Sequence, residues 1–138
     1  MSCLFNSISY FIKDVSSQKI RDKICDYLES NKPIIEGIET KDILDLDRSN
    51  YISSMRQSST WGGAIEIQAA CNIWKLSIIV QNKRNVSGGK KSSIEFLPVS
   101  GNPKYTIELE WTGGHYEPVR AVKNPDPNKI KIIVLGKR

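Results

Sequence analysis

The period of the hydrophobic pattern changes part-way along this chain of 138 residues, and no other feature restricts its fold as strongly. Up to about residue 75, apolar residues recur at helical spacing, as Leu4, Ile8 and Phe11 do near the N-terminus. Beyond that point come short alternating or β-branched segments separated by turns: 76–82, 92–99, 105–111, 115–122 and 129–136. Helices followed by strands predict an α+β fold, in which N-terminal helices pack on a mainly antiparallel C-terminal β-sheet.

The helical half divides into several elements. Ser16 or Ser17 can cap a second helix that stops before Asn31, and the charged face of this helix is predicted to be solvated. The acidic segment 36–47 predicts short helical turns and loop, and a short helix follows it. Segment 64–75 is apolar all round, which predicts a buried helix. The carboxylate of Glu66 can accept hydrogen bonds from the first backbone amides of this helix. At this length we expect one domain, residues 1–138.

Composition excludes several classes of protein. No apolar run approaches the roughly 20 residues that cross a bilayer, and the N-terminus lacks a signal-peptide pattern, so we expect no membrane partner and no secretion. The cysteines Cys3, Cys25 and Cys71 show no CxxC spacing. We therefore expect neither a disulfide framework nor a metal site, no cofactor, and a reducing, cytoplasmic location.

The charge is polarised along the chain. Residues 1–70 hold 8 Lys and Arg against 10 Asp and Glu, whereas residues 71–138 hold 12 against 5. The basic half leaves a nucleic-acid-binding module open as an alternative. Its basic residues form no clear stripe and do not clearly alternate with aromatic residues, so we expect no nucleic-acid partner.

One cysteine and the single histidine suggest nucleophilic chemistry. Cys3 would lie at the N-terminus of the first helix, where unpaired amides and the helix dipole favour a thiolate. His115 follows a Gly-Gly turn at the start of a strand, and Glu117 would share its face and could orient the imidazole. Plainer interpretations are a core cysteine, a surface histidine and a solvated acid. Cys25 and Cys71 fall inside helices, which favours the core for both.

These residues recur within an ordered set of motifs: Cys3-Leu4-Phe5, Tyr51 with Met55, Trp61-Gly62-Gly63, Glu66-Ile67-Gln68-Ala69 and His115-Tyr116. The set resembles the ovarian tumour (OTU) family of cysteine peptidases, many of which are deubiquitinating enzymes. The resemblance covers nearly the whole chain. It implies a papain-like OTU fold and a thiol protease that hydrolyses the amide or isopeptide bond after the C-terminal Gly-Gly of ubiquitin or a ubiquitin-like modifier.

The resemblance also assigns catalytic roles. Cys3 is the expected nucleophile, His115 the general base and then acid, and Glu117 the residue that holds the imidazole. The partner implied is ubiquitin or a ubiquitin-like protein, bound by a monomer.

Two further groups are expected to bind the substrate. Trp61, Gly62 and Gly63 fall where family members shape a channel for the Gly-Gly tail, although Trp61 could instead fill the core. The acidic residues fall in a region that commonly helps to form the ubiquitin surface in this family, with a solvated loop as the alternative: Glu36, Glu39 and Asp42.

Two departures from the family motifs leave a second hypothesis open. The Asp-Gly-Asn that precedes the nucleophile is reduced to Met1-Ser2, and Glu117 stands where Asp or Asn is usual. The longer side chain displaces the carboxylate, and a misplacement of about 1 Å can cost about 100-fold in rate. The alternative is a catalytically weak OTU fold that binds ubiquitin or a host partner without cleaving it. The short chain resembles compact viral and bacterial members, which would place it in a host cytoplasm.

Overall fold

The computed structural model of the chain describes residues 2–83, 92–119 and 133–134. Helices come first and the main strands second, so the predicted α+β class is confirmed. The elements in chain order are α1 (Cys3–Phe11), β1 (Ile12–Lys13), α2 (Ser17–Glu29), α3 (Thr40–Asp47), α4 (Tyr51–Met55), α5 (Ala64–Trp74), β2 (Leu76–Asn82), β3 (Ser92–Phe96), β4 (Tyr105–Trp111), β5 (Tyr116–Pro118) and β6 (Ile133–Val134).

Local signals set the ends of the helices. Ser16 caps α2, because its Oγ accepts a hydrogen bond from the Lys19 amide (3.2 Å). The α5 helix ends where Lys75 adopts a left-handed conformation, with φ of 55°. The acidic segment forms a more regular helix than predicted, α3, because Thr40 and Leu44 lie one turn apart and are both buried.

The main sheet has the strand order β3-β2-β4-β5. Its two outer pairings, β2 with β3 and β4 with β5, are antiparallel as predicted. The central pairing of β2 with β4 is parallel, with Leu76 opposite Tyr105 and Val80 opposite Leu109. The sheet is therefore mixed. The chain returns from the end of β3 to the start of β2 before β4 begins, which makes β4 run in the same direction as β2.

The strands expected near the C-terminus are described only in part. Segment 115–122 contributes β5, and its residues beyond 119 lie outside the described ranges, as does nearly all of the turn expected at 85–92. Segment 129–136 contributes β6, which pairs in parallel with β1.

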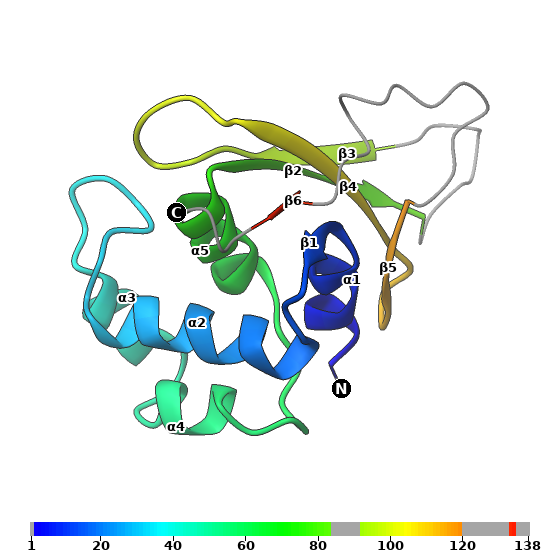
Figure 1. Cartoon of the computed structure of the whole chain (residues 1–138). Helices are drawn as coiled ribbons and strands as arrows, with labels where there is room; N and C mark the ends of the chain where they lie inside the picture. Colours follow the sequence, from blue (N-terminus) through cyan, green and yellow to red (C-terminus); the bar gives the residue numbers. More distant parts are fainter. Residues whose placement is uncertain (1, 84–91, 120–132, 135–138) are drawn as a thin grey trace.

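The core lies between the sheet and the helices. Figure 1 shows the sheet lying across α1 and α5, with α2, α3 and α4 on the far side of these two helices. Buried residues from each layer meet there: Leu4, Phe5, Ile8, Ile20, Ile24, Leu28, Ile67, Ala70, Leu76, Ile78, Ile107 and Leu109. Cys25 and Cys71 belong to this core, as predicted. Among the described residues, no helix is long and apolar enough to cross a membrane.

Candidate active site

Cys3 is the first residue of α1 and is partly exposed. The rest of the first turn is anchored, because Leu4 and Phe5 are buried. The Cys3 carbonyl accepts a hydrogen bond from Ser7 Oγ (2.7 Å), and the Ser2 carbonyl accepts one from the Asn6 amide (2.7 Å). These contacts place the thiol beside the first turn of a helix, where backbone N–H groups have no partner within the helix.

His115 reaches the same place from the other half of the chain. It follows a turn between β4 and β5 in which Gly113 has φ of 104°, a conformation that glycine adopts without strain. The His115 carbonyl closes this turn by accepting a hydrogen bond from the Thr112 amide (3.0 Å). Strand β5 pairs with β4 and lies against α1, which brings His115 to the start of that helix.

Cys3, His115 and Glu117 line one small cavity of about 190 Å³, together with Asn6, Ser7, Tyr116 and Pro118. His115 Nε2 lies 3.3 Å from Glu117 Oε1. The side chains of His115 and Glu117, two residues apart in extended backbone, therefore lie on the same face, as the sequence predicts. The side chains of His115 and Glu117 are 53% and 63% exposed, so water reaches both.

The thiols of Cys25 and Cys71 have a different environment. Burial raises the pKa of Cys25 to about 11 and that of Cys71 to about 12. Both thiols are therefore protonated at neutral pH and cannot supply a thiolate.

The Trp-Gly-Gly segment contacts α1 and lies near the turn before His115, but none of its three residues is among those that line the cavity. A Cβ atom on Gly62 would lie 2.8 Å from Cδ2 of Leu4 and from Cζ of Phe5, so only glycine allows the backbone this close to α1. A Cβ atom on Gly114 would lie 3.9 Å from the Trp61 ring, which places that ring beside the turn before His115. Trp61 is 50% exposed, so the alternative that it fills the core is wrong.

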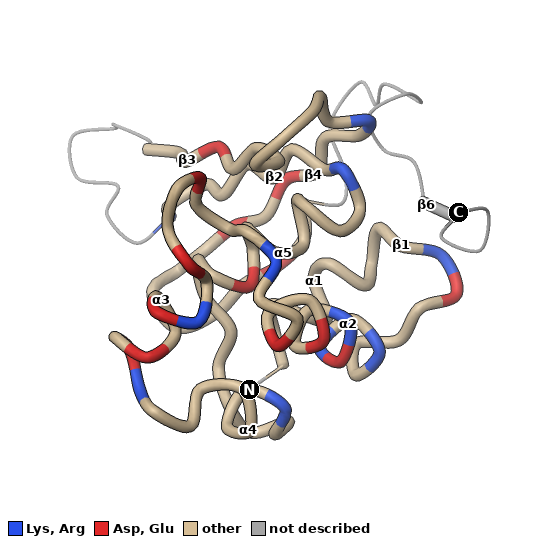
Figure 2. The backbone as a smooth tube through the Cα atoms, turned by 90° about the vertical axis from the view of Figure 1, so that its left-hand side faces the viewer, with Lys and Arg blue, Asp and Glu red and all other residues tan. Residues whose placement is uncertain are grey.

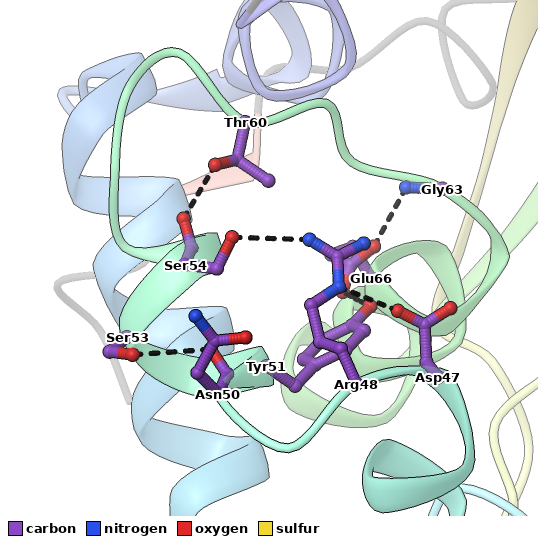
Figure 3. A network of polar contacts seen from close by, with 9 residues as sticks. All are labelled: Asp47, Arg48, Asn50, Tyr51, Ser53, Ser54, Thr60, Gly63 and Glu66. Atoms are coloured by element: carbon purple, nitrogen blue, oxygen red, sulfur yellow. Dashed lines mark hydrogen bonds and ion pairs between the residues drawn. The ribbon is translucent and has the colours of Figure 1, made fainter.

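A buried polar network holds the end of this segment (Figure 3). The Tyr51 hydroxyl donates to Oε2 of Glu66 (2.5 Å), and the Gly63 amide donates to Oε1 (2.7 Å). Glu66 is 1% exposed, and burial raises the pKa of its carboxyl group. The sequence predicted the contact of Glu66 with the first amides of α5. It did not predict the contact with Tyr51, although both residues belong to the same motif set.

The acidic residues lie on a separate surface. Glu36, Glu39 and Asp42 are exposed, on α3 and on the segment that precedes it. Figure 1 shows α3 at the end of α2 away from the start of α1, and Figure 2 shows acidic positions repeated along this part of the chain. The structure therefore does not bring these residues to the Cys3 cavity. Glu39 also has a local role, because its Oε2 accepts a hydrogen bond from Asn31 Nδ2 (2.6 Å).

Apolar side chains that sequence reasoning missed belong to the same part of the chain. Ile35, Ile38 and Leu46 are 49%, 50% and 89% exposed. A long apolar side chain among acids gives no sequence signal that separates exposure from burial, so only the structure identifies this group.

Comparison with known proteins shows the family. The OTU-like cysteine protease family matches residues 2–116. The chain belongs to this family. Ubiquitin thioesterase OTU1 of Xenopus laevis is 29% identical over 141 residues, which cover 98% of this chain and 42% of the relative. Ubiquitin thioesterase otu2 of Schizosaccharomyces pombe is 33% identical over 90 residues, which cover 59% of this chain and 29% of the relative. The chain thus spans less than half the length of these OTU relatives.

Solved structures confirm the OTU fold. The viral OTU domain protease of Dera Ghazi Khan virus aligns with a TM-score of 0.63 at 20% identity, over 85% of this chain and 72% of that chain. An OTU deubiquitinase of Wolbachia pipientis wMel, solved bound to ubiquitin, aligns with a TM-score of 0.56 at 20% identity, over 85% of this chain and 88% of that chain. At these identities the OTU neighbours support the architecture alone.

Proposed function

We propose that this chain is a cysteine-type deubiquitinase that hydrolyses the amide or isopeptide bond after the C-terminal Gly-Gly of ubiquitin or a ubiquitin-like protein. The observation that carries the proposal is the shared cavity, in which Cys3 at a helix start lies with His115 and its acid partner Glu117. Family membership supports the choice of reaction, and the ubiquitin named in the OTU relatives and structures supports the choice of substrate. We place its action as a monomer in a reducing compartment.

In the proposed reaction, Glu117 accepts the N–H at Nε2 of His115, which leaves Nδ1 to exchange protons with Cys3. His115 takes the thiol proton, and the thiolate attacks the carbonyl carbon of the terminal glycine. Backbone N–H groups at the start of α1 stabilise the oxyanion. The amine then leaves with the proton from His115, and a thioester remains on Cys3. Water attacks this thioester with His115 as base, which releases the carboxylate and restores the thiol.

The Trp-Gly-Gly segment would border the substrate tail. Gly62 lies against the helix that carries Cys3, and the Trp61 ring lies beside the turn before His115, so the segment is close to both elements that carry the proposed catalytic pair. A tail that ends in two glycines has no side chains there, which suits a narrow passage.

The exposed surface around α3 would hold the globular part of the substrate. The ubiquitin tail carries an arginine before its glycines and the surrounding face is basic, so carboxylates attract it. Exposed Ile35, Ile38 and Leu46 add apolar area to the same part of the chain, and protein partners cover such area. This combination favours a protein partner over a nucleic acid.

A ubiquitin probe with a C-terminal electrophile tests the peptidase assignment. We expect the probe to attach covalently to Cys3, as located by mass spectrometry, and to leave the Cys3→Ala variant unlabelled. The Cys25→Ala variant is the matched control and should label at the wild-type rate. Binding of ubiquitin without labelling or hydrolysis would instead support the catalytically weak alternative.

Charge reversal tests the acidic surface. Glu36, Asp42 and Asp45 are exposed, and reversing them leaves the Glu39–Asn31 hydrogen bond in place. We expect the triple change to lysine to raise KM markedly and leave kcat nearly unchanged, with a smaller effect at high salt. The comparison variant neutralises the basic residues Lys83, Arg84, Lys90 and Lys91, of which the last three lie outside the described residues. If only this variant binds the substrate more weakly, the substrate binds at these basic residues and not at the acidic surface.

A further inference from the structure

A buried arginine lies behind the candidate site and has no role in the proposed reaction. Arg21 of α2 is 0% exposed, although the sequence predicts that the charged face of this helix is solvated. Burial lowers the pKa of its guanidinium, which nevertheless stays protonated at neutral pH. A buried charge costs free energy unless hydrogen-bond acceptors surround it. The acceptors around Arg21 therefore indicate which segments this side chain holds together.

The guanidinium binds the segment that leads into Trp61-Gly62-Gly63. Its Nη1 donates to the Met55 carbonyl (2.6 Å), and its Nη2 donates to the carbonyls of Thr60 (2.9 Å) and Ser58 (3.4 Å). One side chain thus fixes the path of the backbone between α4 and the Trp-Gly-Gly segment.

The same guanidinium binds the residue that precedes the nucleophile. Its Nη2 donates to Ser2 Oγ (3.2 Å), and Ser2 Oγ donates to the Ser58 carbonyl (3.3 Å). Ser2 is joined directly to Cys3, so a displacement of Ser2 would displace the amide of Cys3.

A stacking contact adds a third link. The guanidinium carbon of Arg21 lies 4.1 Å from the centre of the Phe5 ring. The backbone at Gly62 approaches the same ring so closely that a Cβ atom there would lie 2.8 Å from Cζ. The Phe5 ring therefore contacts both the buried charge and the segment that would border the substrate tail.

We propose that Arg21 is a positioning residue, which holds the backbone at Ser2 and Cys3 in a fixed relation to segment 58–63. The inference rests on the proposed function, because it takes Cys3 as the nucleophile. In that reaction, the backbone at Cys3 donates to the oxyanion while segment 58–63 borders the tail, and a shift of about 1 Å between them can cost about 100-fold in rate. Lysine keeps the charge at this position, but its compact ammonium group cannot reproduce the planar fork that reaches both sides.

The test compares Arg21→Lys, Ser2→Ala and the double variant in hydrolysis of a ubiquitin C-terminal amide. We expect Arg21→Lys to lower kcat by about 10- to 100-fold, with KM changed much less. Ser2→Ala removes one contact and should lower kcat by about fivefold. Because both act through one network, the double variant should be no slower than Arg21→Lys alone.

Two controls separate positioning from stability and from thiol chemistry. Cys25 is buried one turn further along α2, so Cys25→Ala leaves a cavity that lowers Tm. It should keep the wild-type kcat. Alkylation of Cys3 by iodoacetamide forms no oxyanion, so its rate in Arg21→Lys should equal that of the wild type while amide hydrolysis is slow.

Three results would overturn the inference: an unchanged kcat in Arg21→Lys, multiplied effects in the double variant, or alkylation that falls in parallel with hydrolysis. If Arg21→Lys does not fold, Ser2→Ala decides the matter, and an unchanged kcat in that variant overturns the inference. A wild-type chain that neither hydrolyses the amide nor reacts with the electrophilic probe would instead overturn the proposed function, and the inference with it.

Discussion

The two sides of the Cys3 cavity are built differently. The side that carries Cys3 rests on the core, where Phe5 is fully buried against Gly62 and the side chains of Arg21 and Glu66 are buried as well. The side that carries His115 is formed by the residue just before β5 and by β5 itself, an edge strand of 3 residues. There the side chains of His115 and Glu117 are 53% and 63% exposed.

The core therefore fixes the position of Cys3, whereas the position of His115 depends on a few local contacts. Cys3 cannot move without disturbing buried neighbours, whereas a short edge strand has few buried contacts and opens at a lower free energy than the core. We therefore expect the nucleophile side to be intolerant of added atoms, and the base side to respond to substitutions through rate more than through stability.

The largest effect should come from removing either member of the proposed nucleophile pair. Cys3→Ala and His115→Ala should each lower hydrolysis of a ubiquitin C-terminal amide by at least about 10³-fold, because they act as one unit. Both side chains are partly or largely exposed, so the Tm of each variant should stay close to that of the wild type. Full activity in either variant would refute the peptidase assignment.

Glycine substitutions compare the two sides directly. Gly62→Ala places a Cβ atom 2.8 Å from Leu4 and Phe5, and overpacking of this kind costs about 1–3 kcal/mol, to be measured by denaturant unfolding. Gly114→Ala is the matched control on the base side, where the nearest atom is 3.9 Å away, and it should change stability by less than about 0.5 kcal/mol. Equal losses of stability in the two variants would contradict the contrast between the sides.

Glu117 tests the base side alone. Glu117→Ala should lose part of the rate, about 10-fold in kcat, because the imidazole loses the acceptor 3.3 Å from its Nε2. Glu117→Asp should retain or improve the rate, since the family uses a shorter side chain at this position. Steady-state kinetics of both variants provide the measurement, and an unchanged rate in Glu117→Ala would mean that another group orients His115.

The smallest effect concerns the buried thiols at alkaline pH. Burial raises the pKa of Cys25 from 9.0 to about 11, so the unfolded chain loses this proton first. The stabilisation from this group is complete below pH 9 and is lost as the pH rises toward 11. Cys25→Ala should therefore lower Tm at pH 8 and show a shallower fall of Tm between pH 9 and 11 than the wild type. Parallel curves for the two proteins would mean that folding does not change the pKa of the Cys25 thiol, which would contradict this prediction.

Local patterns determined much of this protein. The change from helical to alternating periodicity predicted the α+β class. The sequence also predicted that Ser16 or Ser17 caps the second helix and that Glu66 accepts from the first amides of α5, and the structure shows Ser16 and Glu66 in these roles. Strand alternation placed His115 and Glu117 on one face. Cys25 and Cys71 could be assigned to the core because both fall inside predicted helices and away from the starts of those helices. These features depend on residues that are close together in the sequence, so local sequence patterns predict them.

Tertiary structure alone decided the rest. The central pairing of β2 with β4 is parallel, which alternation cannot indicate because both directions share a period of two. The sequence left open whether Trp61 lies in the core or at the surface, and the structure places its ring near Gly114. Arg21 belongs to a charged helix face that the sequence predicts to be solvated, yet its partners include the carbonyls of Met55, Ser58 and Thr60. Such contacts form between segments far apart in sequence, and backbone carbonyls are common to every residue, so no local pattern marks them in advance.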